Sequence, residues 1–281
     1  MSGRGAVVVG GSRGIGFEVA ALLAAQGAGV VVNGRDDVTA AKAAENIDRA
    51  VAFAGSPADP AVADALIDRC VSEFGQIDIL VNCAGTAGLA GESILNVTSE
   101  MFHDLLDAHL VTTFETCRAA APKMAEQGGG AIVNTSSFAF LGDYGGTGYP
   151  AGKGGVNGLT LAIAAELGEH GVRANVVCPG AKTRISTGSN YEAHIADLNR
   201  RGLLDDASTQ AALDAPPPEY AAPLYAYLAG DLAENVTGRI FIAAGGFVGE
   251  FARQTPAIIG YRDHQDSPPW SLAELHAMIG G

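Results

Sequence analysis

The chain alternates short apolar runs with longer segments of helical periodicity, and this alternation limits its fold more than any other feature. The first run, residues 6–10 (AVVVG), precedes a helical pattern over residues 17–27 that ends in glycine. Strands that alternate with helices pack into a parallel sheet with helices on both faces. We therefore predict an α/β fold in a single domain, with a doubly wound, seven-stranded, mostly parallel sheet. Strands are expected at residues 6–10, 29–33, 51–55, 77–85, 131–137, 172–180 and 239–246, and helices at 17–27, 60–75, 98–126 and 149–170.

Two regions depart from this alternation. Residues 181–218 are polar and end in APPP, which predicts a mobile flap beside the site, since ligands of such sheets bind beyond the carboxyl ends of the strands. Residues 247–281 contain several prolines and the only tryptophan, Trp270. We interpret them as a C-terminal tail that packs on the domain or on a neighbouring subunit. The domain that binds the ligand is then residues 1–246.

Composition narrows the class of partner. The formal net charge of −14 argues against nucleic acid or an anionic membrane as the main partner, because both require clustered Lys and Arg. The four cysteines lack metal-ligand spacing, so we predict no metal site and a reduced, intracellular protein. No signal peptide precedes the first strand, and no apolar run reaches the ~18 residues of a membrane span. The expected location is cytoplasmic.

A glycine-rich loop follows the first strand. Its sequence is VGGSRGIG (residues 9–16), in which Gly10, Gly14 and Gly16 have the spacing GxxxGxG between a strand and a helix. Glycine permits a tight turn and close approach of the backbone to a ligand. The helix N-terminus adds N–H groups and a partial positive charge. This loop therefore predicts a site for the pyrophosphate of a dinucleotide.

The end of the second strand bears on which dinucleotide is bound. An acid there would accept a hydrogen bond from the ribose 2′-hydroxyl and repel a 2′-phosphate. Gly34 stands at that position, Arg35 follows it, and Arg13 lies in the first loop. Two arginines and no acid favour NADP(H). Because Asp36 and Asp37 follow at once, NAD remains the alternative cofactor.

The stretch YPAGK places Tyr149 and Lys153 four residues apart in a predicted helix. Residues i and i+4 share a helix face, so the phenol lies beside the ammonium. A free phenol has a pKa near ~10, and a neighbouring cation lowers it by favouring the phenolate. We interpret the pair as a tuned acid–base group that protonates the oxygen of a carbonyl substrate.

Taken in order, VGGSRGIG, NCAG (82–85), Ser136 with Ser137, YPAGK and CPG (178–180) resemble the short-chain dehydrogenase/reductase family over roughly residues 5–246. The resemblance implies a Rossmann-type fold, a nicotinamide cofactor, and hydride exchange with a carbonyl or secondary alcohol. Tyr149 would be the proton donor and Lys153 its modulator. The cofactor would contact Gly10, Ser12, Arg13, Gly14, Ile15, Gly16, Arg35, Ser56, Asn82, Ala84, Gly85, Tyr149, Lys153, Pro179, Gly180 and Thr183.

Two serines compete for the role of substrate anchor. The family's usual spacing to the tyrosine selects Ser136, whereas counting from the end of the strand selects Ser137. Side chains alternate along a strand, so the two point in different directions. We favour Ser137, because the strand end fixes its direction more firmly than the following loop does. Ser136 is then a backbone-capping residue or a secondary substrate contact.

His109 departs from the family, whose members usually carry asparagine there to position the lysine through water. A histidine can also donate and accept hydrogen bonds, but it is larger and it titrates. Three roles stay open: the same relay, an added pH dependence, or a histidine satisfied within its helix. The loop after the third strand also differs, since Ser56 stands where an aspartate usually meets the adenine.

A histidine at position 109 also resembles the hydroxyacyl-CoA dehydrogenase part of peroxisomal multifunctional enzymes. The segments CPGAKTR (178–184) and PPEYAAPLYAYLAG (217–230) look similar to that branch. It implies 3-hydroxyacyl thioesters as substrates, whose phosphates Arg184 in the flap could meet. Those enzymes usually carry the acid that is absent at Gly34.

The sequence thus predicts an NADP(H)-dependent oxidoreductase acting on a small carbonyl or alcohol. Ser137, Tyr149, Lys153 and His109 are its candidate catalytic residues. An NAD-dependent 3-hydroxyacyl-CoA dehydrogenase is the rival enzyme. A nucleotide-binding sensor or scaffold that does no chemistry is the rival of another class. The resemblance also implies a homo-oligomer, a tetramer or dimer, built through the helices at 98–126 and 149–170.

Overall fold

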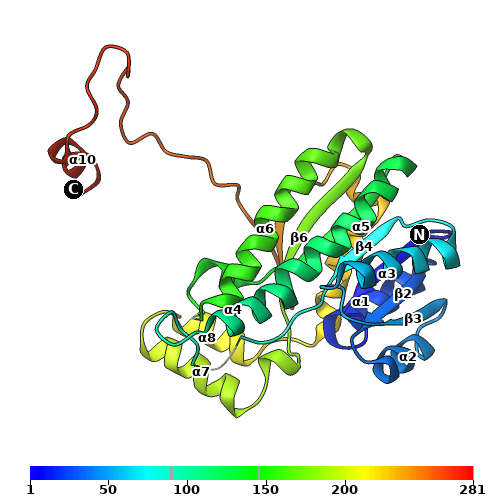
Figure 1. Cartoon of the computed structure of the whole chain (residues 1–281). Helices are drawn as coiled ribbons and strands as arrows, with labels where there is room; N and C mark the ends of the chain where they lie inside the picture. The colour runs from blue at the N-terminus through cyan, green and yellow to red at the C-terminus, as the bar shows by residue number, and fades with distance from the viewer. Residues whose placement is uncertain (89–90, 145, 281) are drawn as a thin grey trace. The chain divides into compact units, whose positions relative to one another are not determined.

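A twisted sheet forms the centre of the molecule (Figure 1). The computed structural model describes residues 1–88, 91–144 and 146–280. The strands are β1 (Gly5–Val9), β2 (Gly29–Gly34), β3 (Ala50–Ala54), β4 (Ile79–Asn82), β5 (Gly130–Thr135), β6 (Val172–Gly180), β7 (Ile240–Ala244) and β8 (Phe247–Phe251). They lie in the order β3-β2-β1-β4-β5-β6-β7-β8, parallel from β3 to β7, with β8 antiparallel to β7. The chain order reverses between β1 and β4, which is where such sheets bind ligands.

Helices cover both faces of the sheet. One layer contains α1 (Gly14–Ala25), α2 (Asp37–Glu45) and α9 (Ala222–Ala229), and the other contains α3 (Pro60–Phe74), α5 (Thr112–Gln127) and α6 (Gly148–Leu167). Because both faces are covered, the central strands are mostly apolar, and every residue of β1 and β2 is buried. Further helices are α4 (Ser99–Leu106), α7 (Ser189–Arg200), α8 (Asp206–Leu213) and α10 (Leu272–Ile279).

The structure corrects the sequence-based boundaries in two places. The sheet has eight strands rather than seven, because residues 247–251, assigned to the tail, return as β8 along the edge of β7. The compact unit accordingly extends to Phe251 rather than ending at residue 246. The predicted flap, residues 181–218, contains α7 and α8, whose buried Ile195, Leu198 and Leu204 form a small core of their own.

A ladder of buried polar side chains joins the strands that end at the site to two helices. The Asn82 amide of β4 donates to Asn134 Oδ1 of β5 at 2.9 Å and accepts from Thr116 Oγ1 of α5 at 2.8 Å. The Asn134 amide in turn donates to Thr160 Oγ1 of α6 at 2.9 Å. All four side chains are at most 3% exposed. Each buried polar group here is therefore partnered, and the ladder ties four elements in one register.

The helix predicted at 98–126 is continuous but changes its winding where it passes the site. Between α4 and α5, residues Asp107–Val111 form a π-helix. Two threonine hydroxyls just after it bond backward, Thr112 Oγ1 to the Asp107 carbonyl at 2.8 Å and Thr113 Oγ1 to the His109 carbonyl at 2.7 Å. These bonds satisfy carbonyls that the wider turn releases from the regular pattern.

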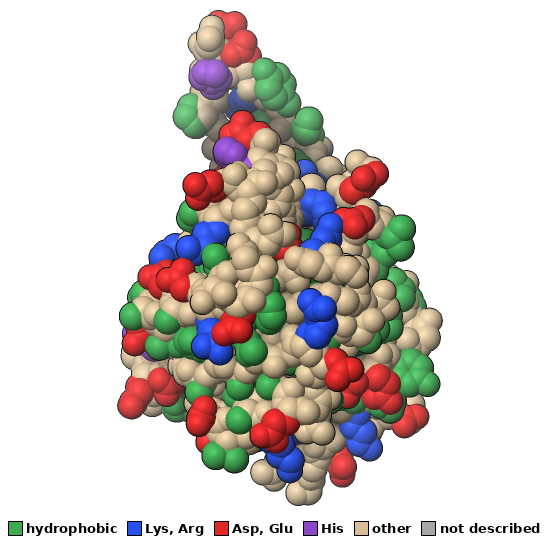
Figure 2. Space-filling model, turned by 90° about the vertical axis from the view of Figure 1, so that its right-hand side faces the viewer, with side chains coloured by type: hydrophobic (Ala, Val, Ile, Leu, Met, Phe, Trp, Pro, Cys, Tyr) green, Lys and Arg blue, Asp and Glu red, His purple; other side chains and the backbone are tan. Residues whose placement is uncertain are grey.

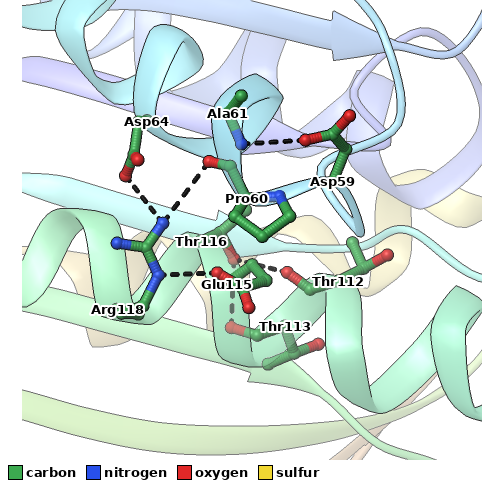
Figure 3. A network of polar contacts seen from close by, with 9 residues as sticks. All are labelled: Asp59, Pro60, Ala61, Asp64, Thr112, Thr113, Glu115, Thr116 and Arg118. Carbon is green, nitrogen blue, oxygen red and sulfur yellow. Dashed lines mark hydrogen bonds and ion pairs between the residues drawn. The ribbon is translucent and has the colours of Figure 1, made fainter.

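Charged side chains form ion pairs and hydrogen bonds that join α5 to α3 (Figure 3). The Arg118 guanidinium donates to Glu115 Oε2 at 2.6 Å within α5 and to Asp64 Oδ1 of α3 at 2.7 Å. Asp59 caps the start of α3 by accepting from the Ala61 N–H at 2.9 Å. Because Arg118 is partly exposed, this network fixes the two helices against each other and contributes only modestly to stability.

Residues Ala252–Gly281 form a separate small unit, which is described through residue 280. The Arg262 guanidinium stacks on the Trp270 ring at 3.5 Å from its centroid and donates to Glu274 Oε1 at 2.6 Å. Ser271 and Glu274 form a reciprocal capping box at the start of α10.

Basic and acidic side chains are interspersed on the face of the molecule in Figure 2. No helix among the described residues combines the length and apolarity that a membrane span requires.

Replacing Asn134 with alanine tests the buried ladder. The Asn82 amide and the Thr160 hydroxyl would each lose a partner inside the core, so we expect the free energy of unfolding to fall by about 2–3 kcal/mol. Urea denaturation measures this change. The matched control is Asn235→Ala, which removes an exposed amide and should leave the midpoint nearly unchanged. Equal effects of the two substitutions would show that the ladder does not stabilise the fold.

Candidate active site

The glycine loop between β1 and α1 packs closely against neighbouring parts of the chain. Gly10 has φ +73°, and a Cβ there would lie 2.7 Å from the backbone of Ala84. A Cβ on Gly16 would lie 2.3 Å from the Gly10 carbonyl oxygen. Gly14 has φ +56°, and a Cβ there would lie 3.7 Å from the Thr183 methyl group. Backbone conformation or lack of space thus favours glycine at each position, and the loop is held tightly against the chain that follows β4.

The N-terminus of α1 is suited to an anion. Arg13 is its N-cap residue and is fully extended, and no side chain caps the helix. The first N–H groups therefore point outward without a side-chain acceptor, at the positive end of the helix dipole. A dinucleotide pyrophosphate fits this arrangement, and Gly14 and Ile15 are the residues whose amides would hold it.

A hollow of about 320 Å³ adjoins the loop at the end of β2. It is lined by Ser12, Arg13, Phe17, Thr39, Lys42, Ala43 and Asn46. Ser12 occupies the space beside Gly34, where a Cβ would lie 2.9 Å from the serine hydroxyl. Within the described residues, neither Arg13 nor Arg35 forms an ion pair. Thr39 and Lys42 escaped the sequence analysis, although they lie one turn apart on the helix after Arg35.

Asp36 is one of the two acids, with Asp37, that kept NAD open, and its carboxylate accepts a hydrogen bond from its own helix. Asp36 Oδ1 accepts from the Thr39 N–H at 2.9 Å and so caps α2. This hydrogen bond lowers the pKa of Asp36, and the nearby Arg13 acts in the same direction. The carboxylate therefore stays ionised but is turned to the helix that follows it.

Three candidate catalytic side chains meet at the carboxyl end of the sheet. Tyr149 and Lys153 lie on the first turns of α6, with the Lys153 Nζ atom 5.8 Å from the centre of the Tyr149 ring. Ser137 lies just beyond β5, close enough to the Tyr149 phenol to oppose the rise of its pKa. Lys153 Nζ donates to the Thr135 carbonyl at 2.9 Å, which fixes the ammonium beside the end of β5.

Burial dominates the protonation of this group. It raises the pKa of Tyr149, and the hydrogen bond with Ser137 opposes the rise without reversing it. Burial also lowers the pKa of Lys153 to about 8. The sequence predicted that the lysine would lower the tyrosine pKa. In the protein alone the tyrosine pKa is raised instead, because burial favours the neutral form of both groups.

The two serines have different surroundings. Ser136 is 2% exposed, and its hydroxyl donates to the Lys153 carbonyl of α6 at 3.0 Å. The Ser137 hydroxyl accepts from the Ala139 N–H at 3.2 Å and faces Tyr149. The alternation along the strand thus sends Ser136 to the helix backbone and Ser137 to the phenol.

His109 lies in the π-helix with its ring against Tyr149. The ring centroids are 4.9 Å apart and the planes are nearly perpendicular. Neither ring nitrogen has a hydrogen-bond partner of good geometry among the described residues. Burial lowers the pKa of His109 to about 2, and the Lys153 charge adds to this. Of the three roles considered, an added pH dependence is the one that this burial opposes.

Five more candidates lie at the edge of the sheet that the glycine loop faces. They follow β4, end β6 or follow β6: Ala84, Gly85, Pro179, Gly180 and Thr183. Thr183 caps a short 3-10 helix with its hydroxyl, and Arg184 beside it is exposed. The Asn82 side chain belongs to the buried ladder rather than to the surface of this edge.

Two further residues complete the surroundings. Ser56 is exposed in the loop after β3, and its carbonyl accepts from the Asp59 N–H at 3.1 Å. Tyr191 of α7 was not singled out by the sequence. Burial raises its pKa to about 12, and the phenols of Tyr144 and Tyr149 contribute. No motif marked Tyr191, because its place near Tyr149 depends on how α7 packs.

Comparison with known proteins identifies the family. Residues 4–193 match the family model of the short chain dehydrogenases. The chain belongs to the short-chain dehydrogenase family. This confirms the resemblance read from the ordered motifs and the Rossmann-type α/β fold, and it supports assignment as an oxidoreductase.

Individual relatives cover most or all of the chain. It is 37% identical to 3alpha-hydroxysteroid dehydrogenase of Mediterraneibacter gnavus over 85% of the chain and 95% of that protein. It is 34% identical to hydroxyacyl-CoA dehydrogenase ChsB1 of Mycobacterium tuberculosis over 99% of the chain and 88% of that protein. A short chain dehydrogenase from Mycobacterium avium has a similar crystal structure, with a TM-score of 0.79 and 31% identity, covering 100% of this chain and 94% of that one.

The buried lysine makes a prediction about stability. Its pKa is lowered from 10.5 to about 8 in the folded protein, so folding releases a proton between these values. The ammonium therefore destabilises the fold below about pH 8, by on the order of 3 kcal/mol, and the penalty fades as the pH rises toward the unfolded value. We expect Lys153→Met to raise the free energy of unfolding near pH 7, with a smaller gain near pH 10.

Urea denaturation at the two pH values measures this difference. Lys182→Met is the control, because it removes an exposed lysine and should show no such pH dependence. A Lys153→Met protein that is less stable than the parent at both pH values would contradict the predicted penalty.

Proposed function

We propose that this protein is an NADP(H)-preferring oxidoreductase that transfers a hydride between the nicotinamide and a carbonyl or secondary alcohol. The observation that carries the proposal is the grouping of Tyr149 and buried Lys153, whose Nζ lies 5.8 Å from the phenol ring, with Ser137 at the end of β5. These three side chains offer two donors to one substrate oxygen and a cation behind them. That is the arrangement a carbonyl needs as negative charge develops on its oxygen.

The residues divide the work of the reduction. The bound cofactor would supply the hydride. Ser137 and Tyr149 donate hydrogen bonds to the carbonyl oxygen, and Tyr149 then releases its proton to that oxygen. A raised phenol pKa keeps Tyr149 protonated and ready to donate at neutral pH. The Lys153 ammonium stabilises the phenolate that remains, in a pocket where desolvation strengthens their attraction. In the oxidation direction the same steps run in reverse.

His109 acts on this group from the side in our proposal. Its ring packs on Tyr149, and its buried nitrogens have hydrogen-bonding capacity that the described residues do not use. A water molecule bridging His109 and Lys153 would satisfy both and would replace the relay that an asparagine provides. As a neutral ring, His109 can accept a hydrogen bond at one nitrogen and donate one at the other.

Preference for NADP(H) is supported by charge. Arg13 and Lys42 line the hollow beside Ser12, and exposed Arg35 follows the second strand. A 2′-phosphate placed there would meet three cations, whereas the Asp36 carboxylate that a ribose hydroxyl would need is engaged in capping α2. Thr39 lines the same hollow and adds a hydroxyl to it.

A 3-hydroxyacyl-CoA thioester is the second candidate substrate. It is favoured by the similarity to a hydroxyacyl-CoA dehydrogenase that extends over 99% of the chain, the C-terminal unit included. In this reading Arg184, which is exposed in the segment after β6, would meet a phosphate of such a substrate. The hydroxysteroid relative instead favours a bulky cyclic alcohol.

Assembly into dimers or tetramers through α5 and α6 remains part of the proposal, with exposed Phe114 and Leu161 on those helices as contacts.

Three single substitutions test the chemistry. We expect Tyr149→Phe and Ser137→Ala to lower kcat by about 100-fold or more, because each removes a donor to the developing oxyanion. Ser136→Ala, the matched control, should retain most of the activity, since its hydroxyl serves the helix backbone. NADPH absorbance follows turnover with cyclohexanone and acetoacetyl-CoA as probes. A Tyr149→Phe protein as active as the parent would refute the mechanism, and binding of NADPH without turnover of any carbonyl would favour a sensor or scaffold.

Cofactor titration tests the preference. We expect NADPH to bind more tightly than NADH, and Arg13→Ala, Arg35→Ala and Lys42→Ala each to weaken NADPH binding by about 5- to 50-fold, corresponding to ~1–2 kcal/mol. Binding of NADH should change little, because it lacks the 2′-phosphate. Nicotinamide fluorescence measures both affinities. Equal loss for the two cofactors, or tighter binding of NADH by the parent, would contradict the assignment and raise the hydroxyacyl-CoA alternative.

A further inference from the structure

The helix that carries Tyr149 and Lys153 begins without a cap of its own. The N-cap residue of α6 is Thr147, whose side chain makes no capping hydrogen bond. The first N–H groups of a helix need an acceptor, and here a distant side chain supplies it. Glu92 Oε1 accepts from the Thr147 N–H at 3.1 Å and from the Gly148 N–H at 2.7 Å. Glu92 belongs to the connection between β4 and α4, so the cap joins two separate segments.

The fit around this carboxylate is close. Glu92 is 6% exposed, which is unusual for an acid and fits its role as an acceptor for buried donors. A Cβ on Gly148 would lie 2.7 Å from Leu105 Cδ1 and 3.4 Å from Glu92 Oε1. Glycine at 148 therefore lets α4 and the carboxylate approach the helix end. Within the described residues, Glu92 Oε2 has no partner, so the two amides are what the side chain serves.

The same connection contacts the catalytic group at two other points. A Cβ on Gly88 would lie 3.4 Å from Tyr149 Cβ, and one on Gly85 would lie 2.8 Å from the His109 ring. Tyr149 directly follows the capped Gly148, in the first turn of the helix. First turns open locally more readily than helix interiors, so the position of the Tyr149 phenol depends on what holds that turn.

We propose that Glu92 is a positioning residue for Tyr149. Its carboxylate holds the first turn of α6 against the connection after β4, and so keeps the phenol in its place beside Lys153. The proposal rests on the role of Tyr149 in the proposed function. Glu92 touches neither substrate nor cofactor in this arrangement, and it acts through the backbone amides of Thr147 and Gly148. Loss of the cap should therefore lower kcat and leave cofactor affinity unchanged.

Two variants of Glu92 distinguish the effect of side-chain length from the effect of charge. Glu92→Gln keeps an acceptor oxygen at the same reach without the charge, whereas Glu92→Asp keeps the charge but is one methylene too short. Glu100→Gln is the matched control, because Glu100 is an exposed glutamate in the first turn of the nearby α4. Each variant is assayed as the full chain for kcat with cyclohexanone and acetoacetyl-CoA, for NADPH affinity, and for hydrogen exchange of the α6 first-turn amides.

We expect Glu92→Asp to lower kcat by about 10- to 100-fold, since a displacement of about 1 Å in a reacting group has effects of that size. The Thr147 and Gly148 amides should exchange faster in this variant, while NADPH affinity stays within about twofold of the parent. Glu92→Gln should restore kcat to within about threefold and restore amide protection, and Glu100→Gln should match the parent in every measurement. Thermal melting confirms that each variant is folded.

Two outcomes would overturn the proposal. One is parental kcat and parental amide exchange in Glu92→Asp. The other is a Glu92→Gln protein as impaired as Glu92→Asp, which would mean that the charge matters and the cap does not. A parent that turns over no carbonyl refutes the proposed function instead. In that case the exchange rates of the Thr147 and Gly148 amides still decide whether Glu92 holds the turn.

Discussion

The buried hydrogen bond between Asn82 and Asn134 is the interaction on which the rest of the site depends. It joins neighbouring residues of β4 and β5 where both strands approach the carboxyl edge of the sheet. Thr116 and Thr160 extend it into α5, which follows the π-helix, and α6, which carries Tyr149. In a core of valine and isoleucine, such groups are tolerated only when every partner is in place. The ladder therefore specifies one register for the four elements, and the positions of His109, Ser137 and Tyr149 follow from it.

Desolvation, more than any single charge, determines the chemistry that the pocket can perform. Burial raises the pKa of Tyr149 and lowers those of Lys153 and His109, so at neutral pH Tyr149 and His109 are neutral while Lys153, with a pKa of about 8, stays mostly charged. A pocket of this kind binds a polar carbonyl through hydrogen bonds and responds strongly to any charge that enters it. The charges that complete the proposed reaction would come with the dinucleotide, whose pyrophosphate the bare end of α1 would receive.

The layered fold could be predicted from the sequence because its central strands are continuous apolar runs, and that pattern has few other solutions. The eighth strand was missed because FVGEF is neither uniformly apolar nor flanked by a helix, and its pairing depends on β7 lying beside it. Helix α2 was missed because DVTAAKAAE offers little apolar periodicity, and it forms under a cap from Asp36.

The glycine, serine, tyrosine and lysine motifs of the site could be predicted from the sequence, because each lies at the end of a strand or in the turns beside it. The residues that escaped notice reach the site through tertiary packing. Lys42 does so from the face of α2 and Tyr191 from α7. Glu92 is the clearest example, because an acid in an irregular connection has no periodicity to indicate that it caps a helix more than fifty residues later.

The π-helix at Asp107–Val111 has a consequence for how this site can diverge. A π-turn accommodates one residue more than the α-helical path it replaces, and so behaves as an absorbed insertion. The phase of the helix changes there by roughly 100°, the rotation per residue of an α-helix. Substitutions before the π-helix and after it can therefore accumulate independently in evolution. The side chain at position 109 can change beside Tyr149 while α5 keeps its packing on the sheet.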